Sequence, residues 1–284
     1  MVRFLLPALL LATQLEAQVT IRTEPEAPAR GSLIRIYITP NTAQLTDVNA
    51  SVADEPLHLS TTDQATWSGL AGIPVDGGDT VLVQVTLTTP LGSQVEPVVL
   101  KVRQPPYPSE KLTVAPGMAE PDSLAQARIK AENRKARAVG TAAHGTERLW
   151  SQPFRLPRTS RITSQFGTAR EFNGSVTSRH MGTDFAGAIG APVRAANRGR
   201  VVLVDRFYLA GRVVYIDHGE GLISAYFHLT RALVTVGQVV ERGQLIGTVG
   251  RSGRVTGPHL HWVMRYGNTT VDPITVVALT TGSK

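Results

Sequence analysis

Histidine and aspartate side chains gather in two short motifs of this 284-residue chain. The first motif, RHMGTD at residues 179–184, contains His180 and Asp184. The second, GPHLH at residues 257–261, contains His259 and His261. Imidazole and carboxylate are the ligands that zinc takes when it does hydrolytic chemistry. Because three of only seven histidines stand in these motifs, the pattern predicts a metal site rather than scattered surface histidines.

Local geometry strengthens this prediction. Side chains two residues apart on a strand share a face, so His259 and His261 would enter one groove, roughly 6–7 Å apart along the backbone. Spacing alone leaves open which of them binds the metal and which acts on water or substrate. Gly182 lies inside the first motif and disfavours a helix there. Together with His228, which ends an apolar run, the two motifs favour a metal site over a polar surface.

The N-terminal part of the chain reads as short strands separated by turns. Residues 34–38 and 81–87 alternate apolar with polar side chains, which is the period of a half-buried strand. Turns rich in glycine or proline bound the second run. We therefore predict an immunoglobulin-like β-sandwich over residues 18–104. His58 lies in an apolar-flanked segment of it and is interpreted as a structural histidine.

A proline-rich linker and a basic helix are predicted over residues 105–148. The prolines of residues 105–108 favour extended backbone. Ser123 and Gln126 have capping-box spacing, and Gly140 can end the helix. Its cations are Arg128, Lys130, Arg134, Lys135 and Arg137. This charge could contact an anionic polymer or an acidic surface, although a solvated connecting helix is the favoured interpretation.

Glycines and β-branched residues dominate again in the C-terminal part, residues 149–284. Its strand-like segments are residues 199–204, 212–216, 222–227, 245–249 and 259–263. The turns between them are rich in glycine, as closely connected antiparallel strands require. We predict an antiparallel β-sheet domain here and an all-β fold class for the chain.

Composition and the first residues bear on compartment and partners. The net charge of +7 and the pI of 10.0 would attract an anionic polymer, but they also fit a solubilising surface. A basic start and an apolar run, too short to span a bilayer, are typical of a signal peptide, which we place at residues 1–17. An uncleaved anchor is the alternative. We expect an exported, periplasmic or extracellular protein, associated with the cell envelope and without a membrane span after signal removal.

The absence of cysteine removes one source of stability from such an exported protein. Without disulfides, hydrophobic packing and a bound metal would have to stabilise the fold. Hydrophobic residues make up 42% of the chain and charged residues 18%, an ordinary globular balance with no signature of disorder.

The complete motif set resembles that of the lysostaphin-like M23 zinc metallopeptidases, also called LytM-domain proteins. The set comprises the His-x-x-x-Asp of residues 180–184, the His-Leu of residues 228–229 and the TGPHLH of residues 256–261. The resemblance extends over about residues 153–279. It implies a domain that cuts the peptide parts of bacterial peptidoglycan. The sandwich and the basic helix are similar, more weakly, to the accessory region of some longer members.

Carried over by position, the resemblance implies one zinc ion per catalytic domain. His180, Asp184 and His261 would bind it, with water or hydroxide at the open fourth position. His259 would take the proton of this water as the catalytic base. His228, the second catalytic histidine, would stabilise the oxyanion or pass a proton to the leaving amine.

The remaining site assignments are weaker. Asn173, Tyr226 and Arg254 are candidates for substrate contact, although a turn or packing role is an equal alternative for each. His218 belongs to a recurrent motif of the family, VYIDHG at residues 214–219, in which the histidine looks structural.

The expected function is that of a zinc metalloendopeptidase hydrolysing peptide cross-links of peptidoglycan. One alternative is a catalytically silent LytM-type protein that binds the wall and activates a separate amidase, but the intact residue set argues against it. Another is a zinc peptidase acting on glycine-rich proteins. The sandwich or the basic helix could block the groove until a partner releases it. A regulatory cell-envelope protein is therefore a candidate partner. Nucleic-acid binding has no recognised motif, so we expect no such partner.

Overall fold

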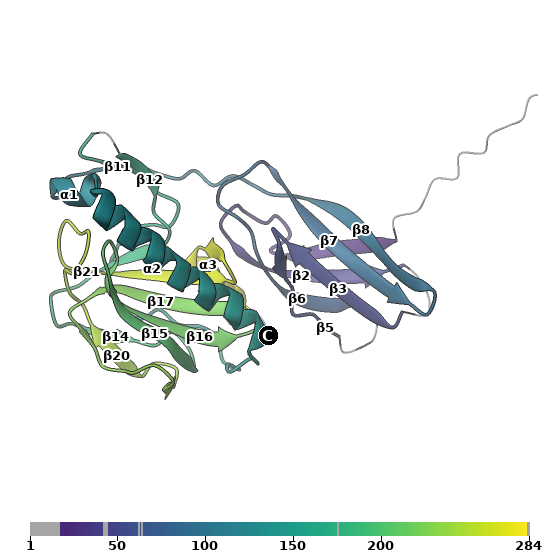
Figure 1. The fold of residues 1–284 in the computed structure, drawn as a ribbon. Coiled ribbons are helices and arrows are strands. Elements are labelled where there is room, and N and C mark those ends of the chain that lie inside the picture. Colours follow the sequence, from purple (N-terminus) through teal and green to yellow (C-terminus); the bar gives the residue numbers. More distant parts are fainter. Residues whose placement is uncertain (1–17, 42–44, 62, 64, 175, 283–284) are drawn as a thin grey trace, which may run out of the picture.

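Two β-rich units lie side by side in the computed structural model, and a long helix runs along one of them (Figure 1). The structure describes residues 18–41, 45–61, 63, 65–174 and 176–282. The predicted signal peptide, residues 1–17, lies outside these ranges. The all-β prediction is confirmed, because strands make up most of the regular structure. Within the described ranges, no helix combines the length and apolar character that crossing a membrane requires.

The N-terminal unit is a sandwich of two four-stranded antiparallel sheets. One sheet has the order β1 (Val19–Glu24), β2 (Leu33–Pro40), β6 (Trp67–Gly72), β5 (Ser60–Thr61). The other has the order β4 (Glu55–Pro56), β3 (Asp47–Val52), β7 (Thr80–Thr89), β8 (Gly92–Lys101). This order resembles the ABED and CFG sheets of immunoglobulin domains. It supports the immunoglobulin-like assignment, which stays a prediction.

Alternating apolar residues hold the two sheets together. Ile34, Ile36 and Ile38 of β2 are fully buried, as the period-two pattern predicts. Val83 and Val85 of β7 are equally buried. Each such side chain contributes about 1.5–3 kcal/mol to folding, which lets the sandwich dispense with disulfides.

The connecting segment contributes a strand to the C-terminal unit. After the prolines, β9 (Ser109–Leu112) pairs in parallel with β11 (Ala169–Phe172), which forms a hairpin with β12 (Val176–Arg179). The short helix α1 (Pro116–Ala119) follows. The prediction of a plain linker is therefore incomplete, because this segment adds a strand to the C-terminal unit.

The basic helix is α2 (Ser123–Ala142), continued by the 3₁₀ helix η1 (Ala143–Gly145). Its cap is Asp122, whose side chain accepts a hydrogen bond from Ala125 N, rather than the predicted Ser123. Gly140 does not end the helix. A Cβ at Gly140 would lie 2.6 Å from the Gly267 carbonyl oxygen, so this glycine permits close packing instead.

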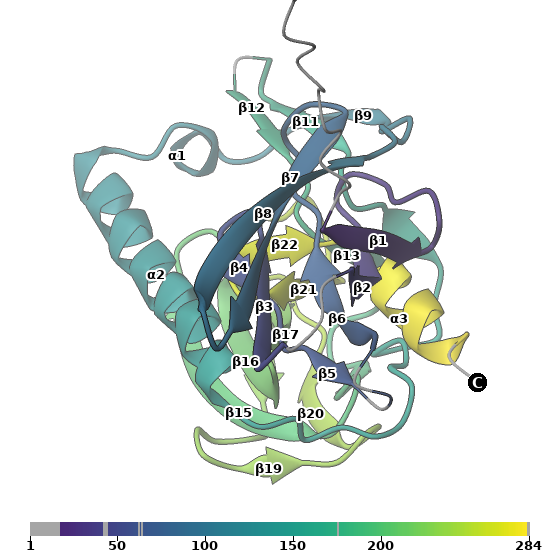
Figure 2. The same cartoon turned by 90° about the vertical axis from the view of Figure 1, so that its right-hand side faces the viewer.

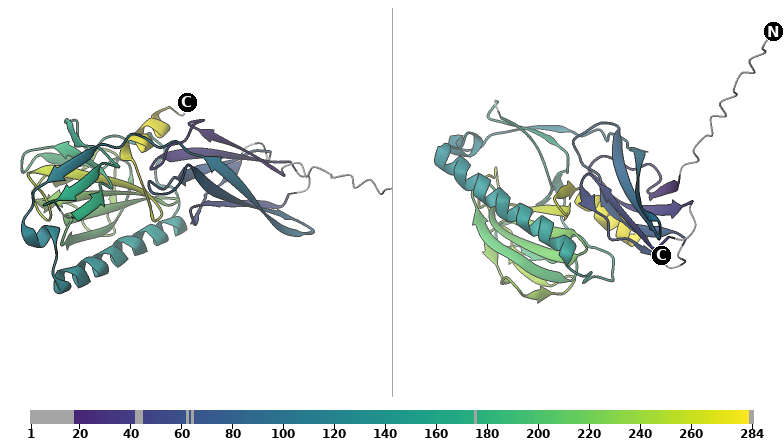
Figure 3. Two further views of the ribbon diagram at one scale, coloured as in Figure 1. Left: turned by 90° about the horizontal axis from the view of Figure 1, so that it is seen from above. Right: turned by 45° about the vertical axis from the view of Figure 1, so that its right-hand side comes forward.

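An antiparallel sheet dominates the C-terminal unit and runs beneath α2 (Figure 1; Figure 3). Its order is β10 (Ile162–Ser164), β13 (Thr183–Ala186), β21 (His259–Tyr266), β17 (Leu222–Leu229), β16 (Gly211–Gly219), β15 (Gly199–Phe207), β19 (Val239–Val240), with β22 (Thr269–Val271) beside β21. A small sheet comprises β14 (Pro192–Arg194), β20 (Leu245–Thr248), β18 (Arg231–Ala232). The predicted antiparallel domain is confirmed.

The C-terminal helix α3 (Pro273–Thr281), which the sequence analysis missed, packs against the sandwich (Figure 2). Leu33 N donates to Thr275 Oγ1 at 3.0 Å across this contact. A second contact stacks His58 on His144, with 3.0 Å between His58 Nε2 and His144 Nδ1. The structural interpretation of His58 is thus confirmed, and the two units share an interface.

Candidate metal centre and catalytic groove

The two motifs meet because β13 and β21 pair with each other. The register places Asp184 directly opposite His261, and His180 lies between β12 and β13, directly after Arg179. Facing residues of neighbouring strands project to the same side of a sheet. Gly182 permits this approach, since a Cβ there would lie 2.7 Å from the His261 ring and 2.6 Å from the Trp262 carbonyl oxygen.

Three potential metal-ligand atoms converge at this point. His180 Nε2 lies 3.0 Å from Asp184 Oδ1 and 2.9 Å from His261 Nδ1, and the latter lies 2.7 Å from Asp184 Oδ1. The carbonyl oxygen of Gln165 lies 2.8 Å from His180 Nδ1. Because a carbonyl only accepts, Nδ1 carries the hydrogen and Nε2 carries the lone pair that a metal needs.

This donor set fits a zinc ion. Ligand atoms around tetrahedral zinc lie about 3.3 Å apart when the bonds measure about 2.0–2.1 Å, so small movements of the side chains would admit the ion. His261, Asp184 and His180 are all buried. No other group of at least three histidine, cysteine or acidic residues with such converging atoms is found among the described residues.

The protonation states suit metal binding. Burial alone would raise the pKa of Asp184, but the contacts with His261 and His180 lower it well below its ordinary value. Burial lowers the pKa of His261 to about 4, although Asp184 opposes this shift. The carboxylate is therefore ionised and the imidazole neutral at neutral pH, which are the forms that bind metals.

Arg170 holds the second oxygen of the predicted ligand Asp184. Its Nη2 donates to Asp184 Oδ2 at 2.7 Å and to Ser164 Oγ at 2.9 Å, while its Nε lies 3.4 Å from Glu110 Oε2. Such outer partners orient a ligating carboxylate and leave its other oxygen directed at the metal. The sequence analysis missed Arg170 and Glu110, which belong to no recognised motif.

We expect Arg170→Gln to weaken zinc binding by roughly 10–100-fold, because Asp184 loses its orienting partner. Competition with a chelating dye would measure the affinity. Arg194→Gln, on the exposed face of β14, is a charge-matched control that should bind zinc normally. Equal affinities of the Arg170 variant and the wild type would contradict this role.

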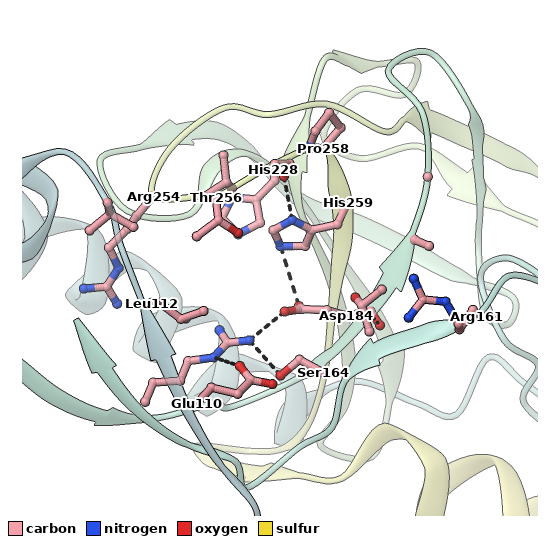
Figure 4. A pocket seen from close by; sticks show the side chains of 17 residues that line it. Glu110, Leu112, Arg161, Ser164, Asp184, His228, Arg254, Thr256, Pro258 and His259 are labelled. Carbon is pink, nitrogen blue, oxygen red and sulfur yellow. Dashed lines mark hydrogen bonds and ion pairs between the residues drawn. The ribbon is translucent and has the colours of Figure 1, made fainter. Parts of the chain in front are cut away.

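The two predicted catalytic histidines face the same cavity (Figure 4). The Nδ1 of His228 bonds to the Ser252 carbonyl oxygen at 2.8 Å, and the Nδ1 of His259 bonds to the Gly257 carbonyl oxygen at 2.9 Å. Each Nδ1 therefore carries a hydrogen, and each Nε2 is left as a base. His259 Nε2 lies 3.7 Å from Asp184 Oδ1. The rings of the two histidines are 4.9 Å apart.

Burial keeps His228 neutral. It lowers the pKa of His228 well below the ordinary value, and the neighbouring His259 and His261 lower it further. A neutral imidazole with a free Nε2 can accept a proton at neutral pH.

The cavity beside these histidines has a volume of about 410 Å³. Asp184, His228 and His259 form one part of its lining, and Arg254 forms another. The connecting segment contributes a third part, with Glu110 and Leu112 of β9 and the following Val114. The structure thus confirms that Arg254 borders the groove, while its contact with substrate stays a prediction.

The other two substrate-contact candidates have different roles. Tyr226 is fully buried, and its hydroxyl accepts a hydrogen bond from Ala196 N at 2.8 Å. Of the two roles predicted for Tyr226, the packing role therefore fits the structure and the substrate contact is wrong. The side-chain amide of Asn173 bonds to both Val114 N and Val114 O. Asn173 thus fastens the connecting segment beside the groove and does not line the cavity.

His218 is structural, as predicted. It is fully buried, with Nδ1 bonded to the Arg198 carbonyl oxygen and Nε2 to Ser224 Oγ, both at 2.8 Å. Burial lowers its pKa from 6.5 to about 4. It does not belong to the converging donor set.

This shift predicts a pH-dependent stability. Above pH 6.5 His218 is neutral in both states, but between pH 6.5 and about 4 only the unfolded chain takes up the proton. The free energy of unfolding should therefore fall by up to about 3 kcal/mol across this range. Denaturant titrations of metal-free protein at several pH values would measure it. His218→Gln should show a smaller fall, and an identical fall in both proteins would contradict the prediction.

Comparison with known proteins agrees with this geometry. Residues 178–273 match the model of peptidase family M23. Peptidoglycan DD-endopeptidase ShyB of Vibrio cholerae is 44% identical over 114 residues, covering 39% of this chain and 26% of the relative. Peptidoglycan DD-endopeptidase ShyA of the same organism is 48% identical over 105 residues, covering 36% and 24%. The matches span about a quarter of these relatives' own length.

A solved structure extends the likeness to the whole fold. A crystal structure from Pseudomonas aeruginosa, provisionally assigned to peptidase M23, superposes with a TM-score of 0.67 at 24% identity. It covers 89% of this chain and 96% of the other, so the two folds agree across both units. Within the C-terminal unit, residues 178–273 form a peptidase M23 domain.

Proposed function

We propose that this protein is a zinc metalloendopeptidase that hydrolyses peptide cross-links of bacterial peptidoglycan. The convergence of His180, Asp184 and His261 beside His228 and His259 carries the proposal. Curated relatives that are 40–48% identical over the M23 region are named peptidoglycan DD-endopeptidases, which supports the choice of substrate.

The protein's own groups supply binding and proton transfer. Bound zinc would lower the pKa of a coordinated water toward ~7 and polarise the scissile carbonyl. His259 takes the proton of the attacking water, since its Nε2 carries a lone pair and lies 3.7 Å from Asp184 Oδ1. His228 also presents an unprotonated Nε2. It therefore serves better as a relay that receives a proton and passes it to the leaving amine than as a permanent oxyanion donor.

The test uses the full-length protein and isolated sacculi. We expect one zinc ion per chain and the release of fragments with newly cut cross-links, which mass spectrometry would identify. A chelator should stop the reaction, and added zinc should restore it. Zinc-free protein that cuts nothing but stimulates an amidase would overturn the proposal. So would a zinc protein that cuts only glycine-rich proteins.

The proposed substrate also bears on location. We propose that the protein is exported to the cell envelope, on the support of the basic and apolar residues at its start. Fractionation of cells that produce the full chain would test this. Recovery with the cytoplasm would contradict it. A regulatory envelope protein remains a proposed partner, and co-purification from cross-linked envelopes would detect it.

A further inference from the structure

The catalytic cavity contains more positive than negative side chains. Its arginines are Arg161, Arg170 and Arg254, and its carboxylates are Glu110 and Asp184. Arg170 contacts both carboxylates, at 3.4 Å and 2.7 Å. The two acidic groups are therefore already paired with a cation, which leaves Arg161 and Arg254 unbalanced within the cavity.

Arg254 is the more enclosed of these two arginines. Its guanidinium carbon lies 4.1 Å from the centre of the Phe172 ring. Within the part of the chain that the structure describes, this guanidinium makes no ion pair or hydrogen bond. Burial and the neighbouring Arg170 lower its pKa, so the site disfavours the charge as it stands. A partly buried cation without an anion is costly, and a planar guanidinium pairs best with a carboxylate.

The backbone fixes Arg254 beside the reacting groups. Arg254 N donates to the Leu209 carbonyl oxygen at 2.8 Å. Gly253, with φ +79°, allows this close approach, because a Cβ there would lie 2.3 Å from the same oxygen. Arg254 also lines a second cavity, of about 190 Å³, which shares His228 and Arg170 with the first. It therefore stands where the two cavities adjoin.

Arg161 adds positive charge at another wall. Its carbonyl oxygen accepts a hydrogen bond from Ala186 N at 2.9 Å, which ties it to the strand that carries Asp184. Its exposed guanidinium makes no ion pair with any residue that the structure describes. Arg254 and Arg161 lie at opposite sides of the cavity, with Asp184 and His259 between them (Figure 4).

We propose that Arg254 binds a free carboxylate of the peptide substrate next to the scissile bond, with Arg161 supplying further positive charge at the opposite wall. This inference rests on the proposed peptidase function and names the substrate class, an acidic peptide. A bidentate arginine–carboxylate pair fixes orientation as well as charge. The carboxylate belongs either to the last residue of a peptide or to a branched residue within a cross-link.

Matched peptides test this recognition. The zinc-loaded full-length protein is given cross-linked peptides that carry either the free carboxylate or the carboxamide in its place. We expect kcat/KM to favour the carboxylate by roughly 10–100-fold, chiefly through KM, because hydrogen bonds between charged groups contribute most to binding. Linear peptides with a free or an amidated last residue form the second arm. The arm that shows the preference identifies the source of the carboxylate.

The variants separate recognition from general damage. Arg254→Gln should reduce the preference to about one while keeping its zinc, and Arg254→Lys should restore part of it. Arg251→Gln, an exposed change in the same loop that borders a different cavity, should keep the full preference. Calorimetric binding of the same peptides to His259→Ala protein, with and without Arg254→Gln, reports recognition without turnover.

The two ideas fail in different ways. If the wild type cleaves no peptide of either kind, the proposed function fails, and the calorimetric comparison still decides whether Arg254 binds a carboxylate. If the wild type cleaves carboxylate and carboxamide peptides equally well, the carboxylate site is wrong while the peptidase stands. The carboxylate site is equally wrong if the Arg254→Gln protein keeps the preference.

Discussion

Replacing Asp184 by alanine is expected to remove zinc from the protein and to reduce peptide hydrolysis to the background rate. Asp184 Oδ1 contacts the nitrogen atoms of both His180 and His261, and Oδ2 accepts from Arg170. The variant loses a proposed ligand, and Arg170 loses the nearer of its two carboxylate partners beside the metal position. Zinc affinity should therefore fall by more than the roughly 10–100-fold that loss of an outer partner costs.

Zinc analysis after dialysis and a competition titration would measure this loss. His180→Ala should behave in the same way, because His180 Nε2 belongs to the same converging set. Asp205→Ala, which removes a surface carboxylate paired with Lys135, should keep both zinc and activity. Full zinc occupancy in the Asp184→Ala protein at low zinc concentration would refute the assigned ligand set.

The second large effect separates catalysis from metal binding. His259→Ala should keep most of its zinc but lose about 10²–10⁴-fold in kcat, the usual contribution of a general base. His259 Nε2 lies 3.7 Å from Asp184 Oδ1, whereas His261 Nδ1 lies 2.7 Å from it. We therefore propose the nearer histidine as the ligand, and the farther one has space for water or substrate.

Steady-state kinetics and zinc analysis on the same preparation would decide this assignment. The free energy of unfolding should change little, because the His259 side chain is half-buried and its hydrogen bond goes to the nearby Gly257 carbonyl oxygen. Comparison with His228→Ala would show whether two histidines transfer protons. Wild-type turnover by the His259→Ala protein would remove His259 from the mechanism, and parallel loss of zinc would make it a ligand.

The strand period was enough to predict much of this site from the sequence. It placed His259 and His261 on one face of a strand, and the pairing of β21 with β13 agrees. The division between base and ligand could not come from spacing, because both side chains point the same way. That division came from the family resemblance, and the unequal distances to Asp184 now support it.

The strand period does not hold between Tyr226 and His228. Two residues before His228, Tyr226 should share its face. His228, however, has φ +61°, a conformation that residues other than glycine seldom adopt. The alternation therefore breaks at the end of β17, and Tyr226 lies in the core while His228 borders the cavity. No residue type in this run signals the break.

Arg170 and Glu110 escaped prediction for a different reason. They come together because β9 pairs with β11 across sixty residues of sequence, with Glu110 next to Arg170 in the register. Antiparallel neighbours are often joined by a short turn that can be recognised in the sequence. Parallel strands are joined by a long connection instead, so the sequence near β9 or β11 contains no signal of their pairing. Only the tertiary structure shows that the connecting segment borders the groove.

The pairing of β9 with β11 has a consequence for the order of events during synthesis. The ribosome releases β9 well before β11, and α1 and α2 lie between them in the chain. Closing so long a loop costs entropy, which favours late formation of this contact. The groove wall that contains Glu110 and Leu112 therefore forms only after the β11–β12 hairpin has been synthesised, although Glu110 and Leu112 themselves emerge earlier. A nascent chain stalled before residue 169 would hold a finished sandwich beside an unpaired strand.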